Sequence, residues 1–169
     1  DEVTATLTLS TTEVVQGSNV QFTVTGVEEA SDVSVAIDVG DYTGSSTGSN
    51  ERGEDVFRNV GDVTDRKNDT SNMWAVLEVD DGQAVGSIDT TDLDTDTISV
   101  EVYQGTSPSG DEDDSVDLEV IDGDVSLTGP SGTYVVGSKV DVTGTATEGI
   151  DNVAIYARAG GDWELVEIS

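Results

Sequence analysis

The sequence predicts an all-β protein built of two successive antiparallel β-sandwiches, the second of them incomplete. Three observations support this prediction: short segments with alternating apolar and polar residues, turn residues between those segments, and an internal repeat. Alternation with a period of two is typical of a strand with one buried and one solvated face. No segment of the 169 residues shows sustained helical periodicity.

Six alternating segments lie in the first two thirds of the chain. Each is rich in Val, Ile, Thr or aromatic residues, which suit a pleated sheet, and is bounded by Gly, Asp, Asn or Ser. The predicted strands are residues 3–9, 20–24, 33–39, 74–79, 98–103 and 116–120. Residues 54–60 are predicted as one or two helical turns or a strand, and the polar residues 41–53 and 61–72 as loops. The aromatic residues interpreted as core anchors are Phe22, Phe57, Trp74 and Trp163, with a core position expected for at least three of the four.

An internal repeat sets the domain count. Residues 7–23 match residues 127–143 at a constant offset, and both copies carry a Gly-Ser pair that predicts a turn. The predicted domains are residues 1–121 and 122–169. In the second copy, the predicted strands are residues 125–127, 139–145, 153–158 and 163–168.

The second domain holds only about half of the ~100 residues of a typical sandwich. Half a sandwich leaves an apolar face and two strand edges uncovered. The sequence is therefore interpreted as an excerpt from a longer protein, with the missing strands beyond Ser169. A small, self-sufficient four-stranded domain is the alternative.

The composition excludes several classes of function. There are 36 acidic and 6 basic residues, a formal net charge of −30, and neither Cys nor His. This excludes disulfides, thiol and imidazole catalysis, and Cys or His metal sites. Strong negative charge repels nucleic acid, and no apolar run reaches the ~20 residues of a membrane span. Neither enzymatic activity nor a catalytic cofactor is expected.

The acidity also indicates the salt concentration at which the protein folds. Like charges oppose compaction in dilute buffer, whereas at 1 M salt the screening length falls to ~3 Å. A folded halophilic protein is therefore predicted. An acidic, disordered chain is the alternative, and the recurring strand pattern argues against it.

Several segments, taken in order, resemble the S-layer glycoproteins of halophilic archaea. They are residues 12–25, 56–62, 75–80 with 84–86, 132–141, 153–158 and 161–168. The resemblance implies immunoglobulin-like domains of a secreted, N-glycosylated structural protein, anchored at its C-terminal end and located outside the cell in the surface layer. It also implies that copies self-assemble into a two-dimensional lattice. An adhesin or ligand-binding module of a haloarchaeal surface protein is the alternative.

Two kinds of candidate site follow. Asn68-Asp69-Thr70 is the only Asn-x-Ser/Thr sequon, and because the family is N-glycosylated, we expect a glycan on Asn68, with an unmodified loop Asn as the alternative. Carboxylates close together in turns can supply the oxygen ligands of Ca²⁺ or Mg²⁺ as a structural ion, with a hydrated acidic surface as the alternative. The candidate metal ligands are Asp111, Asp113 and Asp114 in one cluster, and Asp122 and Asp124 at the domain junction.

Four of the six basic residues, Arg52, Arg58, Arg66 and Lys67, lie within a short stretch. Two interpretations are open. The stretch either meets an acidic patch on a neighbouring subunit or neutralises carboxylates of its own domain.

Overall fold

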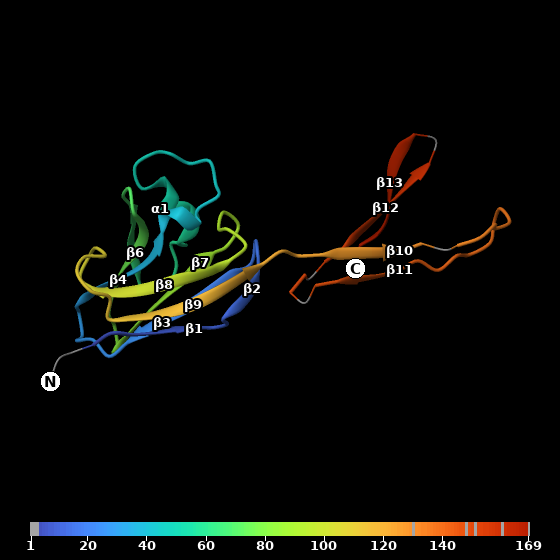
Figure 1. Cartoon of the computed structure of the whole chain (residues 1–169). Helices are drawn as coiled ribbons and strands as arrows, with labels where there is room; N and C mark the ends of the chain where they lie inside the picture. Colours follow the sequence, from blue (N-terminus) through green and yellow to red (C-terminus); the bar gives the residue numbers. More distant parts are fainter. Residues whose placement is uncertain (1–3, 130, 148, 151, 160, 169) are drawn as a thin grey trace. The chain divides into compact units, whose positions relative to one another are not determined.

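The computed structural model describes residues 4–129, 131–147, 149–150, 152–159 and 161–168 (Figure 1). Residue 3 of the first predicted strand lies outside them. The chain divides into two compact units, Asp1–Asp122 and Gly123–Ser169. Regular structure in the described residues is almost entirely β-strand, so the prediction of an all-β protein is confirmed. The immunoglobulin-like detail stays a prediction.

The first unit is made of two sheets, with strand orders β1-β3-β7 and β2-β9-β8-β4-β6-β5. All neighbouring strands are antiparallel except β2 and β9, which are parallel. The elements are β1 (Thr6–Leu9), β2 (Glu13–Val15), β3 (Asn19–Thr25), β4 (Asp32–Asp38), the 3₁₀ turn η1 (Val39–Asp41), α1 (Glu51–Val56), β5 (Val63–Asn68), β6 (Asn72–Glu78), β7 (Gln83–Asp89), β8 (Thr97–Gln104) and β9 (Asp114–Ile121).

The two sheets bury one shared core. In β3 the alternation is complete, with Val20, Phe22 and Val24 fully buried and the flanking polar residues outside. The rings of Phe22 and Phe57 meet edge to face, with centroids 6.3 Å apart. Such a pair adds about 0.5–1.5 kcal/mol to the stabilisation from burial alone. Both residues are core anchors, as predicted.

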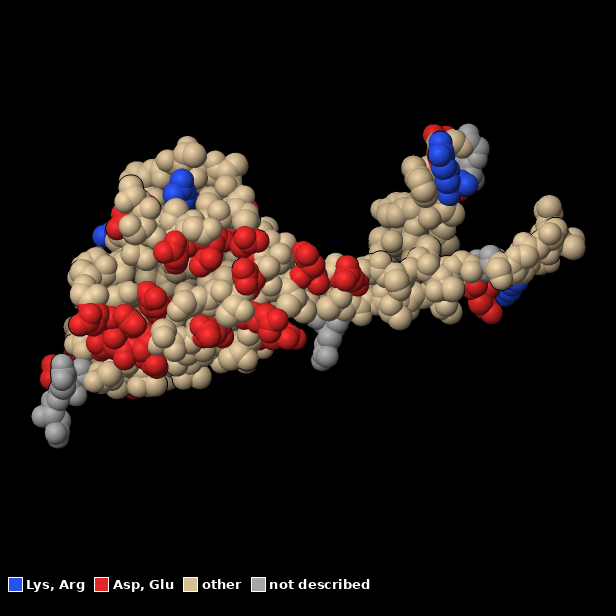
Figure 2. All heavy atoms as spheres, in the orientation of Figure 1, with Lys and Arg blue, Asp and Glu red and all other residues tan. Residues whose placement is uncertain are grey.

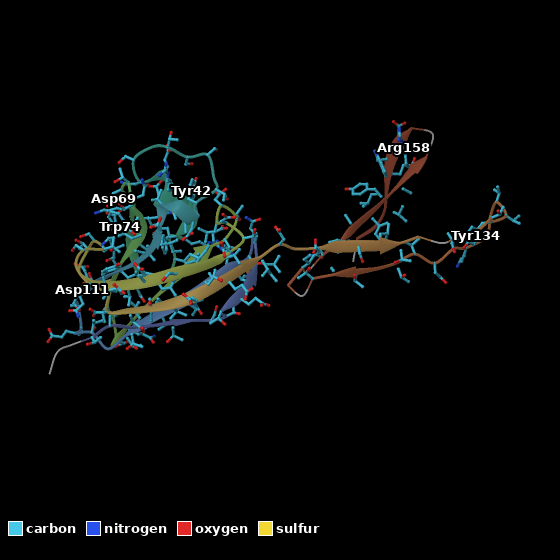
Figure 3. The ribbon with its side chains drawn as sticks, in the orientation of Figure 1. Tyr42, Asp69, Trp74, Asp111, Tyr134 and Arg158 are labelled. Atoms are coloured by element: carbon cyan, nitrogen blue, oxygen red, sulfur yellow. The ribbon has the colours of Figure 1, made fainter. Side chains whose placement is uncertain are left out.

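The outer face of the six-stranded sheet is covered in its middle. Ala36, Trp74, Val76 and Tyr103 form a second buried cluster there. The indole N–H of Trp74 donates to the carbonyl of Thr106 at 3.1 Å, which holds the β8–β9 loop over this face (Figure 3). Because β4 and β6 are covered on both faces, their sequences are nearly continuous apolar runs.

Part of the region predicted as loop has regular structure. The α-helix begins at Glu51, earlier than expected, and residues 63–68 form the edge strand β5. In β5 most side chains are polar and at least partly exposed, so the strand carries no apolar alternation that a sequence pattern could detect. The prediction of a loop over residues 61–72 is therefore wrong.

The second unit contains two separate antiparallel hairpin sheets among its described residues. They are β10 (Val125–Thr128) with β11 (Thr143–Ala146), and β12 (Ala154–Ala159) with β13 (Asp162–Ile168). The predicted strand 139–145 is confirmed only from Thr143 onward. Trp163 is 67% exposed, with the guanidinium of Arg158 6.0 Å from its ring, so it is the exception among the four aromatic residues interpreted as core anchors.

The predicted repeat is reproduced in the strand register. Leu7 pairs with Val24 in the first unit, and Leu127 pairs with Gly144 in the second, so the offset of 120 holds on both strands. The Gly-Ser turn is repeated as well. Gly17 and Gly137 have φ values of +92° and +94°, which a residue with a Cβ rarely adopts.

Candidate glycan and ion sites

Asn68 lies at the last position of β5, beside the start of α1. Its side-chain oxygen Oδ1 accepts hydrogen bonds from the backbone amides of Arg52 at 3.1 Å and Gly53 at 3.4 Å. These amides belong to the first turn of the helix, where no acceptor exists within the helix itself. Asn50, the residue at the N-cap position, makes no side-chain capping bond. Asn68 therefore caps the helix from a neighbouring strand.

The close approach of α1 to β5 depends on Gly53. A Cβ on Gly53 would overlap the backbone of Lys67, so only glycine allows the helix to lie this near the strand. The contact brings the first-turn amides within reach of the Asn68 side chain. Sequence reasoning missed this cap because the two partners are about 15 residues apart and belong to different elements.

The sequon occupies a tight hairpin between β5 and β6. The carboxylate of Asp69, labelled in Figure 3, accepts from the amides of Ser71 and Asn72, both at 2.7 Å. Thr70 is exposed and Asn68 is half-buried. N-linked sugars are attached to the side-chain nitrogen of Asn, whereas the cap uses the oxygen. The two roles are chemically compatible, and the glycan itself stays a prediction.

Two of the candidate metal ligands accept hydrogen bonds from backbone amides. Asp113 accepts from the amide of Ala5 at 2.7 Å, and Asp114 accepts from the amide of Leu7 at 2.9 Å. The amide of Leu7 lies on β1, an edge strand of the three-stranded sheet, and that of Ala5 comes directly before it, while Asp114 begins β9 in the other sheet. The two carboxylates therefore close a strand edge and join the two sheets on that side.

The remaining candidate ligands do not form a site within one unit. Asp111 is exposed in the β8–β9 loop (Figure 3), Asp122 ends the first unit, and Asp124 belongs to the second. The backbone of Asp124 is hydrogen-bonded to Thr147. Across the described parts of the chain, no three acidic side chains are placed to hold a metal ion. A structural Ca²⁺ or Mg²⁺ stays a prediction.

Asp41 in η1 lies among other carboxylates. Burial, followed by the negative charges of Asp38, Asp94 and Asp96, raises the pKa of Asp41 above its ordinary value of 3.8. The folded state then binds this proton more tightly than the unfolded chain does. Ionised Asp41 therefore opposes folding at neutral pH, and its effect fades as the pH falls through the raised pKa.

Three of the four basic side chains of the first unit make local contacts. Arg66 donates to the carbonyls of Glu54 and Phe57 at 3.1 and 3.2 Å, at the end of α1 where carbonyls lack helical partners. Arg52 donates to the carbonyl of Ser46. Lys67 and Asp65, 3.0 Å apart, form the one ion pair among the described residues. These contacts favour a role within the domain.

The acidic side chains cover much of the first unit. Figure 2 shows them spread over the face on which β8 and β9 lie in front, with few basic groups among them. On the outer face of the sheet, Asp117 and Glu119 of β9 stand opposite Ser99 and Thr97 of β8 rather than opposite cations. This surface carries uncompensated negative charge.

Comparison with known proteins identifies relatives over nearly the whole chain. A cell surface glycoprotein of Haloarcula japonica is 36% identical over 98% of this chain and 23% of its own length. Those of Halobacterium salinarum and Haloarcula marismortui are 34% and 30% identical over 97% of this chain. The chain spans about a quarter of the length of these relatives. No model of a known protein family matches it.

Replacing Asp114 by Ala is expected to lower the free energy of unfolding by about 1–3 kcal/mol, because the partly buried amide of Leu7 loses its acceptor. Urea unfolding in molar salt measures the loss, since screening there removes the general repulsion among carboxylates. Asp117→Ala, which removes an exposed carboxylate from the same strand, is the matched control, with an expected change below about 0.5 kcal/mol. Equal losses in both variants would contradict the role assigned to Asp114.

Asp41→Asn is expected to raise the free energy of unfolding at pH 7, because it removes a carboxylate whose ionisation opposes folding. The gain is expected to shrink in molar salt and to vanish well below pH 3.8, where Asp41 is protonated in both states. Unfolding titrations over pH and salt measure it, with Glu78→Gln on the exposed end of β6 as the control. A gain that persists at low pH would contradict the electrostatic origin.

In the described part of the chain, no helix has the length and apolar composition needed to cross a membrane. The expected location outside the cell, at its surface, agrees with the names of the relatives. The predicted resemblance is confirmed: over nearly its whole length, the chain is a relative of the cell surface glycoproteins of halophilic archaea.

Proposed function

We propose that the chain is a structural segment of a surface layer, in which copies of the parent protein self-assemble into a two-dimensional lattice. The similarity to haloarchaeal cell surface glycoproteins carries this proposal. Because the chain spans about a quarter of those relatives, the lattice is a property of the whole protein, to which this segment contributes.

The surface of the first unit supports a role in salt-dependent assembly. Its acidic face repels a second such face at low ionic strength, and at molar salt the repulsion acts over only ~3 Å. The edges of β1 and β7, the outer strands of the three-stranded sheet, are occupied, which hinders edge-to-edge pairing between copies. Copies would therefore associate through side-chain surfaces, with cations between opposed carboxylates.

The edge of β7 illustrates how edges are closed. The extended segment that follows α1 lies along it, with the amide of Arg58 donating to the carbonyl of Ser87 at 2.9 Å. Asp62 adds a second clamp, since its amide donates to the carbonyl of Val85 and its carboxylate accepts from the amide of Val85. These backbone groups of β7 are therefore not available to pair with a strand of a neighbouring molecule.

We also propose that the native protein carries an N-linked glycan on Asn68. The hairpin presents Thr70 to solvent, and the cap leaves the side-chain nitrogen of Asn68 without a role in it. A sugar at this position would project from the β5 edge. It would add a further barrier to strand pairing on that side of the six-stranded sheet.

Two substitutions separate the glycan from the cap. Thr70→Ala is expected to abolish the sugar in the haloarchaeal host, detected as a loss of mass on the Asn68 peptide, and to leave stability unchanged in unglycosylated protein. Asn68→Ala is expected to abolish the sugar and also to destabilise the unglycosylated chain by about 0.5–2 kcal/mol, the usual effect of a lost cap. An unmodified Asn68 peptide from native cells would overturn the glycan proposal.

Electron microscopy of the purified parent protein in molar salt, with and without Ca²⁺, tests the lattice. Ordered two-dimensional arrays are the expected result, and arrays only with Ca²⁺ would support bridging ions. Dispersed particles under every condition would contradict the lattice and favour the adhesin, which presents one loop cluster to a ligand instead of several patches to copies of itself.

A further inference from the structure

The second unit exposes apolar side chains that a folded domain would ordinarily bury. Val125 and Leu127 of β10 are 55% and 61% exposed, and Val140 and Val142 are each 42% exposed. The side chains around Leu127 and Val142 line an open groove of about 440 Å³, whose wall also includes Val153 and Ile155. A contiguous apolar surface of this kind marks a place where other structure binds.

The first unit shows what covers the same positions. At the offset of 120, Leu127, Val140 and Val142 correspond to Leu7, Val20 and Phe22, which are buried in the core. In the first unit, β3 pairs with β1 on one side and with β7 on the other. Likewise, β4 pairs with β6 on one side and with β8 on the other, and β9 follows β8 in the sheet. Among the described residues of the second unit, β11 pairs only with β10, and β12 only with β13.

We propose that three further β-strands of the same polypeptide cover this groove, arranged as β7, β8 and β9 are in the first unit. The first of them would pair antiparallel with the free edge of β11, and the second with the free edge of β12. The proposal concerns folding within one polypeptide and does not depend on lattice assembly.

Two observations favour the same polypeptide as the source. In the first unit, the covering strands follow β4 and β6 in chain order, and the repeat predicts that order again. The matched relatives are about four times as long as the stretch they share with this chain, so proteins of this kind contain further sequence that can supply strands. A tethered strand also binds at a high effective concentration.

The charge distribution agrees with a covered surface. Residues 123–169 carry 7 acidic and 2 basic side chains, whereas residues 1–122 carry 29 and 4. Per residue, the net charge of the second unit is about half that of the first. A surface destined for solvent in this protein would be expected to carry the higher charge density.

The groove also sets the size of the side chains that fill it. In the first unit, Gly86 lies opposite Phe22, and a Cβ there would overlap the Phe22 ring. The second unit has Val142 at the position of Phe22 and Gly144 at the position of Val24. Val142 and Gly144 are smaller than Phe22 and Val24. The proposed strand that pairs with β11 therefore has room for aliphatic side chains at the positions where β7 has Gly86 and Ala84.

Hydrogen exchange compares this 169-residue chain with a version that continues for roughly 50 residues, the missing half of a ~100-residue sandwich. In the longer chain, amides on the outer edge of β11 are expected to exchange at least about a hundredfold more slowly than in the 169-residue chain. Unchanged exchange in the longer chain would overturn the proposal. Protection in the short chain that grows with its concentration would also overturn it, and would identify a second copy as the cover.

Val142→Asp provides an independent readout. It is expected to lower the melting temperature of the second unit in the longer chain by several degrees and to leave the 169-residue chain unchanged. Val136→Asp is the matched control, because Val136 is fully exposed and corresponds to the polar Gln16 of the first unit. No difference between Val142→Asp and the control in the longer chain would overturn the proposal.

Discussion

The chain has far more carboxylates than cations, and the rest of the structure depends on how it accommodates them. Basic side chains can pair with only a small fraction of 36 acidic residues. Backbone amides supply the missing donors, because strand edges and turns have N–H groups that the sheets do not use. Asp114 accepts from an amide of β1, Asp113 from the amide just before β1, and Asp62 from an amide of β7. A charge-assisted bond of this kind is stronger than a neutral one.

This use of carboxylates links composition to function. An amide held by a carboxylate is not free to pair with another molecule, so the groups that make the protein acidic also close its edges. Other side chains also bind unpaired backbone groups. Arg66 donates to carbonyls at the end of α1, and the neutral Asn68 accepts from amides at its start. The remaining carboxylates face solvent, where salt controls their mutual repulsion.

The sequence predicted the fold class and most strands, because buried strands such as β3 and β8 alternate regularly. It missed β2, β5, β7 and the true start of α1, because a short edge strand need not alternate and β7 carries a glycine where the Phe22 ring packs. From their spacing alone it predicted Asp113 and Asp114 as metal ligands, which stays a prediction, and it did not foresee their bonds to backbone amides. Spacing shows that carboxylates are close together, but not that β1 presents its amides to them. That contact joins residues more than 100 positions apart.

Nuclear magnetic resonance tests the central claim most directly, through the scalar coupling that passes across a hydrogen bond. We predict a coupling between the backbone nitrogen of Leu7 and the side-chain carboxyl carbon of Asp114 in molar salt, and at every lower salt concentration at which the unit stays folded, because the bond is partly buried. Absence of this coupling, with rapid exchange of the Leu7 amide, would contradict the claim that acidic side chains close the edges of the sheets.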